Sequence, residues 1–474
     1  MDRPVTSGLA SALALVLLLL AAPTAAQAVP VLEKDDHTLN LDGSLKAFIF
    51  GMDLPHHPPE LLGTMGLSAG SPRGGMGMAD IRLKLEGNHF EKYKWELHFR
   101  TQALISSFSG ALGSISLAGG AAYPPRILPL GGVAPDGARF RWSHELDRVN
   151  VRLRFGKVDL IVGRQAISFG AGFVWKPADL VGTFSPTEVD SEYKPGVDAI
   201  RLNIALGDFT ELALVVALGG PHCTSGSYPD GTSCHSYDVR LYAHGAKPLH
   251  YFDHSVALAR FRTNVKNLDV GAIAGWVRGD VVFGAFLTGT VKRFRIRAEA
   301  VYTWDVEEDL NYAGQGNPTG ADDHFARVVF GVDYTFKTKK ALSILAEIHY
   351  NGYGTRHAHE YLERLSRPRV AEFGEIFNVG LLYAAFGINW EPHYKLPVAL
   401  TIMGNLFDPS MFINANITYK VGDESILVLG AMIPIGRRPK TGDLFDSDPT
   451  NDILIRSEFG LYPYIYYLQW KMYF

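Results

Sequence analysis

Arginine occurs at every second position in several stretches of the chain, and this spacing could give one face of a β-strand a strong positive charge. In the stretch 293–304, Arg293, Arg295 and Arg297 alternate with apolar residues, and Glu299 follows them in the same phase. Side chains two residues apart in a strand point to the same face. Guanidinium groups bind carboxylate and phosphate oxygens, so such a face could attract anions. The polar phases of other alternating stretches contain further arginines, namely Arg100, Arg152, Arg154, Arg201 and Arg327.

Two roles are open for these arginines. Basic residues outnumber acidic ones in the polar phases, although the whole chain has a net charge of -4. An excess of positive charge on a pore wall would favour anions. Alternatively, the arginines form cross-strand ion pairs with acidic residues and hold the wall together. The sequence is compatible with both roles.

The sequence gives no sign of catalytic chemistry. Serine and histidine are scattered, and no nucleophile–base arrangement has a supporting context. The acidic stretch 443–452 and the pair His56-His57 are interpreted as surface residues rather than metal ligands. We therefore expect no enzyme, no cofactor and no metal site. The net charge of -4 argues against nucleic-acid binding.

The N-terminus carries the pattern of an export signal. An apolar run, "LASALALVLLLLAAPTAAQA", ends in Ala26-Gln27-Ala28, which matches an A-x-A cleavage pattern. We expect residues 1–28 to be a signal peptide and residues 29–474 to form a single domain. After the signal, no apolar run reaches the ~20 residues that a spanning helix needs.

Alternation of apolar and polar residues dominates the rest of the chain, and it predicts β-strands of bilayer-crossing length. We expect about eighteen strands, within a range of sixteen to twenty, joined alternately by short turns and long links. This is typical of an outer-membrane antiparallel β-barrel with short periplasmic turns and long extracellular loops. The stretch 140–146 must then be loop or an out-of-register extension, and 237–244 must be loop. The expected strands are 39–52, 79–88, 92–105, 149–155, 158–167, 198–206, 210–219, 254–263, 268–277, 280–290, 293–304, 326–337, 340–351, 375–388, 395–405, 411–420, 425–434 and 463–474.

The chain ends in the alternating segment "YYLQWKMYF". A closed barrel must pair its last strand with its first, because an unpaired edge is not tolerated in lipid. A terminal aromatic residue in the lipid-facing phase also resembles the C-terminal signal that outer-membrane barrels present to the assembly machinery. We therefore expect Phe474 to contact that machinery and the barrel to meet outer-membrane lipid and lipopolysaccharide. The barrel is compatible with a monomer or a homotrimer.

The segment 168–197 is the candidate for a constriction. It follows a strand that ends at Arg164 and Gln165, is rich in glycine and proline, and returns to the wall near residue 198. If it folds inward, its mixed charges would create a field across the pore; the alternative is an external loop. The candidate residues in the segment are Lys176, Asp179, Asp190, Glu192 and Lys194.

The same stretch carries a family resemblance. "GRQ…FG", "KPADLVGTFSPTEVD" and "KPGVDAIRL" resemble the early strands of bacterial outer-membrane porins of the alginate-export type. The resemblance covers about forty residues, and only Arg164 and Lys176 match individual positions. It implies an 18-stranded barrel with an arginine-rich lumen that conducts an anionic polysaccharide.

Cys223 and Cys234 flank a polar stretch that we expect to lie in an outer loop. An even pair of cysteines in an oxidising compartment favours a disulfide, and a metal or redox pair is the alternative.

Five functions are compared. The favoured one is a porin for passive diffusion of solutes, preferentially small or polymeric anions. The alternatives are an export channel for an anionic polysaccharide, a barrel enzyme, and a structural or adhesive barrel. A gated importer would need a large plug before the barrel, and only about ten residues separate Val29 from the first expected strand.

Overall fold

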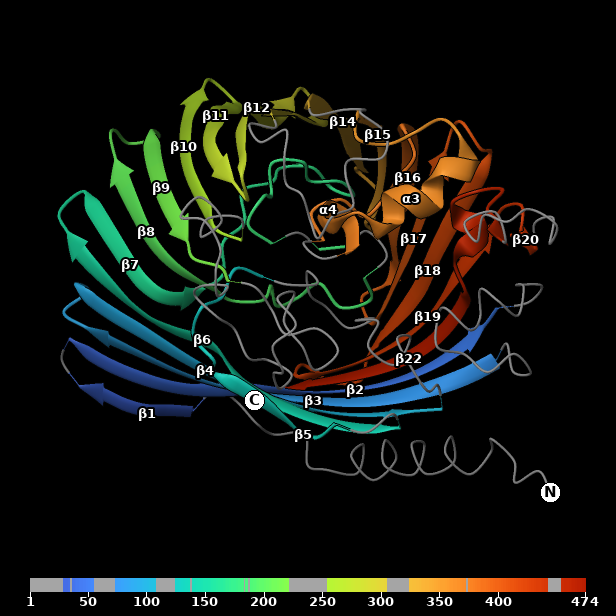
Figure 1. Ribbon diagram of the computed structural model, residues 1–474. Coiled ribbons are helices and arrows are strands. Elements are labelled where there is room, and N and C mark those ends of the chain that lie inside the picture. The colour runs from blue at the N-terminus through green and yellow to red at the C-terminus, as the bar shows by residue number, and fades with distance from the viewer. Residues whose placement is uncertain are drawn as a thin grey trace, which may run out of the picture.

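The wall of the molecule is a ring of antiparallel strands. The computed structural model describes residues 29–34, 36–54, 73–107, 124–136, 139–182, 184–185, 188–220, 254–304, 324–371, 374–441 and 453–474. Within these residues eighteen strands form a closed barrel, because β22 (Tyr464–Tyr473) pairs with both β2 (His37–Asp53) and β19 (Ser425–Ile435) (Figure 1). The all-β barrel predicted from the sequence is confirmed.

Each wall strand pairs with its neighbours in the chain. The strands are β2 (His37–Asp53), β3 (Arg73–His89), β4 (Tyr93–Ser106), β6 (Phe140–Phe155), β7 (Val158–Gln165), β8 (Val197–Ala205), β9 (Glu211–Ala217), β10 (Val256–Val265), β11 (Leu268–Val277), β12 (Asp280–Val291), β13 (Phe294–Trp304), β14 (His324–Phe336), β15 (Leu342–Asn351), β16 (Leu382–His393), β17 (Leu396–Asn405), β18 (Ser410–Lys420), β19 (Ser425–Ile435) and β22 (Tyr464–Tyr473).

The alternation of residue types sorts side chains to the two faces of the wall. In β13, Phe294 and Trp304 are 49% and 53% exposed, whereas Glu299 and Val301 are 1% and 2% exposed. The outward phase is therefore apolar and uncovered, and the inward phase faces other parts of the chain. This is the two-faced ribbon that a period of two residues predicts.

Two short strands complete edges that the wall strands leave open. β1 (Val29–Lys34) pairs with residues 37–41 of β2, beyond the residues 44–53 that pair with β22. β5 (Gly131–Asp136) pairs with residues 141–145 of β6, beyond the residues 149–155 that pair with β7. Both strands satisfy backbone groups that would otherwise be unpaired.

The links alternate in length as the sequence predicts, with short links at 278–279 and 406–409 on the side of the long ones. The stretch 140–146 is an extension of β6 with a register shift opposite His98 and Phe99, which confirms one of the two proposed alternatives. The expected strand 375–388 is displaced: β16 begins at Leu382, because residues 374–381 fold over the inner face of β14 and β15. The stretch 237–244 lies outside the described residues.

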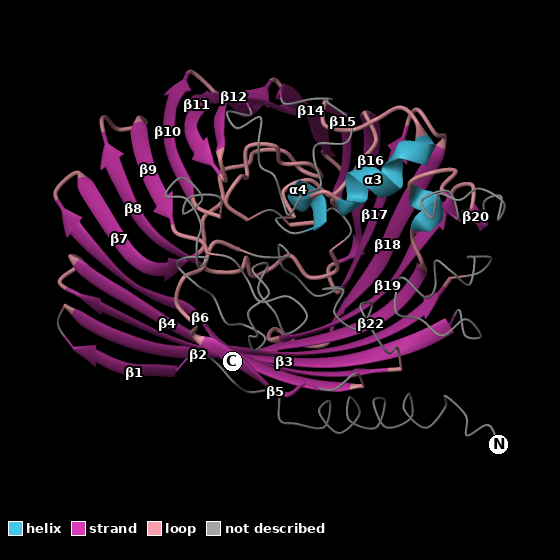
Figure 2. Cartoon of the chain, viewed as in Figure 1, coloured by secondary structure: helices cyan, strands magenta, loops and turns pink. Residues whose placement is uncertain are grey.

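Short helices occur in the long links. They are η3 (Ala358–Glu360), α3 (Tyr361–Ser366), α4 (Pro368–Ala371) and η5 (Phe459–Leu461), and β20 (Lys440–Thr441) pairs with β21 (Ile453–Leu454). Figure 2 shows α3 and α4 inside the outline of the barrel. Among the described helices, none has the length and apolar character needed to cross a bilayer.

Candidate functional site: a narrowed lumen

Residues 166–196, which we call the inserted loop, leave the wall after β7 and cross the inside of the barrel (Figure 1). One part of the loop is apolar, and its Ile167, Phe169 and Leu180 are buried against the inner faces of β8–β12. Their partners there include Val215 and Leu258. Burial of these side chains favours the inward position of the loop over an external one.

Two glutamates of the wall hold the middle of the inserted loop by its backbone. The carboxylate of Glu347 in β15 accepts hydrogen bonds from the amides of Phe173, Val174 and Trp175, at 2.8, 3.0 and 2.9 Å. The carboxylate of Glu299 in β13 does the same for three further loop amides, those of Ala171, Gly172 and Ala178. Hydrogen bonds to an ionised group are about twice as strong as neutral ones. The two carboxylates therefore fix the position of the loop in the lumen.

The far end of the loop carries the acidic candidates, and they are paired. Asp190 contacts Lys46 of β2 and Lys471 of β22, at 2.7 and 3.0 Å. Glu192 contacts the same two lysines. Burial would raise the pKa of both acids, but the lysines outweigh it and hold each pKa below its usual value. Both groups are therefore ionised at neutral pH.

Lys194 and Asp179 form an ion pair within the loop at 2.5 Å. Burial lowers the pKa of Lys194 despite this partner. The pair joins two parts of the inserted loop, and the charges of these two candidate residues neutralise each other.

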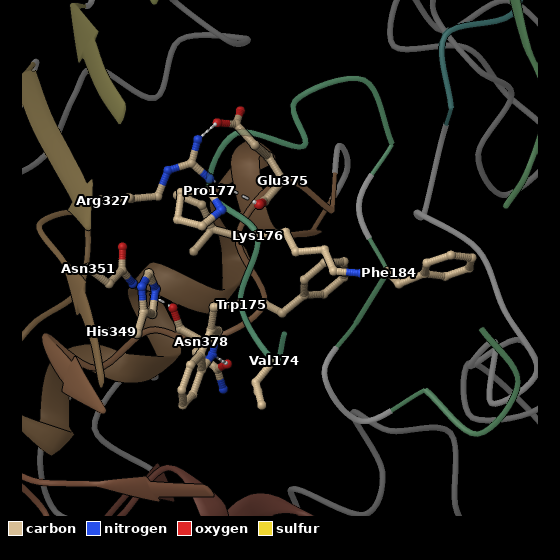
Figure 3. A pocket seen from close by; sticks show the side chains of 12 residues that line it. Val174, Trp175, Lys176, Pro177, Phe184, Arg327, His349, Asn351, Glu375 and Asn378 are labelled. Carbon is tan, nitrogen blue, oxygen red and sulfur yellow. Dashed lines mark hydrogen bonds and ion pairs between the residues drawn. The ribbon is translucent and has the colours of Figure 1, made fainter. Parts of the chain in front are cut away.

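A recess that is open to solvent, with about 390 Å³ of empty volume, lies between the inserted loop and residues 375–378 (Figure 3). Trp175 stacks on His349, with ring centroids 5.2 Å apart, and its indole donates to Asn378 at 3.0 Å. The side chain of Lys176 extends toward Phe184 in Figure 3. Lys176 has no carboxylate within 4.0 Å among the residues that the structure describes.

Most of the predicted pore arginines take part in ion pairs of the wall. Arg100 contacts Asp80 at 2.7 Å, Arg297 contacts Asp333 at 2.9 Å, and Arg327 contacts Glu375 at 2.7 Å. Arg152 and Arg154 share Asp159. Apart from Arg327, whose partner lies in the link before β16, these side chains fit the interpretation that the arginines form cross-strand ion pairs. Arg293 lies in the turn before β13, so the three arginines of that stretch do not share one strand face.

Two arginines differ from these paired ones. They are Arg201 and Arg260, of which Arg260 was not among the residues predicted from the sequence. Arg201 is bonded to the amide oxygen of Asn203, and Arg260 lies over the rings of Phe169 and Phe286 at 5.3 and 4.6 Å. Neither guanidinium has a carboxylate within 4.0 Å in the described part of the chain. The alternation in "VALARFRT" could have indicated Arg260 from the sequence.

Arg164 and Gln165 lie where the inserted loop leaves the wall, not in its crossing. Arg164 contacts Asp198 at 2.7 Å and donates to the carbonyls of Leu128 and Leu146. Beyond the end of β7 at Gln165, residues 125–136 fill the gap between β6 and β8, because they form hydrogen bonds with both β6 and the start of β8. Cys223 and Cys234 lie outside the described residues.

Comparisons with known proteins bear on the architecture. No family model matches the chain, and no curated protein matches its sequence. The crystal structure of Acinetobacter baumannii OccAB1 is similar over 92% of this chain and 96% of that chain, with a TM-score of 0.53 and 9% identity. The crystal structure of OccAB3 from the same organism covers 92% and 99%, with a TM-score of 0.50 and 10% identity. At these identities the similarity shows a shared barrel fold.

Proposed function

We propose that the chain is an outer-membrane channel through which small solutes diffuse, that it favours anions, and that the inserted loop forms its narrowest section. The outward apolar phase of the wall supports a bilayer location. Aromatic side chains near the short turns are exposed as in the interfacial girdle of such barrels: Phe90, Phe155, Phe209, Phe294, Trp390 and Tyr394. Export through residues 1–28 and assembly through Phe474 belong to the same proposal.

The observation that carries the anion preference is the unequal pairing of charges at the level of the inserted loop. The oxygens of Glu299 and Glu347 are occupied by loop amides, and both side chains are buried. Arg201, Arg260 and Lys176 are partly exposed and have no carboxylate partner among the described residues. A permeating ion that has lost part of its water would therefore meet exposed positive groups at short range.

The anchoring of the loop favours small solutes over a polymer. The loop is held on one side by β13 and β15 and on the other by β2 and β22. A crossing segment fixed at both sides divides the lumen, and a long polysaccharide would require it to move. Polymer export is thus the less supported alternative.

Reconstitution of the purified full chain tests the channel itself. In planar bilayers we expect stepwise single-channel currents, and in proteoliposomes we expect swelling with small solutes but not with dextrans. Proteoliposomes that retain salt and sugar gradients would instead indicate a structural or adhesive barrel.

A further inference from the structure

Two lysines face each other across the seam that closes the barrel. Lys46 of β2 and Lys471 of β22 are direct cross-strand partners. Their side chains are 3% and 12% exposed. Like charges directly opposite each other destabilise a strand pair, and burial increases the penalty. The β2–β22 pairing therefore contains an unfavourable element that the two strands do not neutralise for each other.

The inserted loop supplies the missing negative charge. Asp190, 7% exposed, places one oxygen 2.7 Å from Lys46 and the other 3.0 Å from Lys471. Glu192 lies 2.8 and 3.4 Å from the same two lysines, and it accepts a hydrogen bond from the hydroxyl of Tyr473 at 2.8 Å. Each acid thus contacts both the first and the last strand of the wall.

Tyr193 adds to the same contact. Its ring lies between Lys46, Arg82 and Lys84, with the cationic groups 4.6, 4.5 and 5.3 Å from the ring centre. Cation–π contacts of this kind are attractive, and more strongly so when the cation is desolvated. Residues 190–193 therefore cover a cluster of positive groups on β2, β3 and β22.

The seam differs in the source of its counter-charge from two other charged pairs of the wall. Arg297 and Asp333 are cross-strand neighbours in adjacent strands, and so are Arg154 and Asp159. The acids at the seam come instead from a loop that is 144 residues from Lys46 and 281 residues from Lys471 in the chain.

We propose that Asp190 and Glu192 form a strap that joins the two ends of the barrel, so that the β2–β22 seam is fully stable only when the inserted loop is in place. Loop insertion and barrel closure are thereby coupled. Release of the loop weakens the seam, and an open seam removes the anchor of the loop. This coupling is independent of what the lumen conducts.

Hydrogen exchange of the folded full chain in detergent tests the coupling. In Asp190→Asn/Glu192→Gln, we expect the amides of β2 and β22 to exchange at least about tenfold faster than in the wild type. The amides of β11 and β12 should not change. Asp333→Asn is the matched control, because it breaks a wall ion pair away from the seam.

The second part of the test removes the two lysines. In a Lys46→Met/Lys471→Met background, the seam no longer needs the acids, so Asp190→Asn/Glu192→Gln should leave exchange at the seam unchanged. If the acid variant alone does not fold, the lysine substitutions should restore folding. Unchanged seam exchange in the acid variant, equal acceleration in all strands, or failure of the lysine substitutions to suppress the effect would each overturn the proposal.

Discussion

The substitution Glu347→Gln tests whether the wall carboxylates hold the inserted loop in the lumen. Glu347 accepts the amides of Val174 and Trp175 with one oxygen and the amide of Phe173 with the other. Glutamine can keep one oxygen in place, but its NH₂ group then faces an N–H donor. The change is nearly isosteric, so the packing of the wall is retained.

The expected effect follows from the bonds that are lost. A hydrogen bond to a charged group contributes about 1.5–3 kcal/mol, and a buried donor without an acceptor costs about 1–3 kcal/mol. We therefore expect the inserted position to lose about 3 kcal/mol, which is roughly a hundredfold in the equilibrium between inserted and released loop. Because Glu299 still holds its own three amides, the loop should be released more often rather than permanently.

Two measurements would detect release of the inserted loop. The amides of Phe173, Val174 and Trp175 should exchange roughly a hundredfold faster if exchange proceeds through loop release. Single-channel records should show more frequent visits to a higher conductance. Glu211→Gln is the matched control, since Glu211 is an inward-facing acid that contacts Arg262 and no loop amide. Unchanged amide exchange in Glu347→Gln, or the same change in the control, would refute the anchoring role.

Three further predictions concern the loop, the wall and pH. In Gly172→Ala the new methyl group would lie 1.9 Å from the carbonyl oxygen of residue 175. This clash should displace the inserted loop, so larger conductances should appear in single-channel records. Gly182→Ala is the control and should behave as wild type, because its methyl group meets only a lysine methylene at 3.7 Å. Removing Arg201 and Arg260 together should lower the anion-to-cation permeability ratio by about fivefold per charge, from about 1 kcal/mol per charge at close range in water, and an unchanged reversal potential would exclude them as the source of selectivity. For Glu375, burial would raise the pKa, but three surrounding arginines outweigh it and hold the pKa below its usual value. The stabilising contribution of the Glu375 charge is therefore complete above its unfolded pKa of about 4.3, and it is lost as pH falls through the lower folded pKa. The difference in thermal unfolding temperature between wild type and Glu375→Gln should therefore be constant from pH 8 to 6 and should narrow below about pH 4. A gap that does not change with pH would show that the carboxylate charge is not what stabilises this position.

The strands could be predicted from the sequence because alternation reports directly on a two-faced wall. The prediction failed at 375–381, where an apolar pattern continues although the backbone has left the wall. There Glu375 bonds to Arg327, and Asn378 bonds to Trp175 of the inserted loop. These contacts join segments far apart in the chain, and a local pattern contains no information about them.

The inward-facing arginines were also visible in the sequence, but their partners were not. The pairing of Arg297 with Asp333 depends on the register of β13 and β14, which the sequence does not specify to a single residue. The role of Glu347 was missed for a different reason. It binds backbone amides of a loop about 170 residues away, and backbone donors have no side-chain signature.

The reversal potential of single wild-type channels in a KCl gradient tests the central claim most directly. We expect stepwise currents whose reversal potential has the sign of chloride preference, because Arg201, Arg260 and Lys176 have no carboxylate within 4.0 Å in the described chain. Glu299 and Glu347, by contrast, are buried and bonded to loop amides. A reversal potential of the opposite sign would contradict the anion-favouring lumen, and a correctly folded barrel that carries no current would contradict the channel itself.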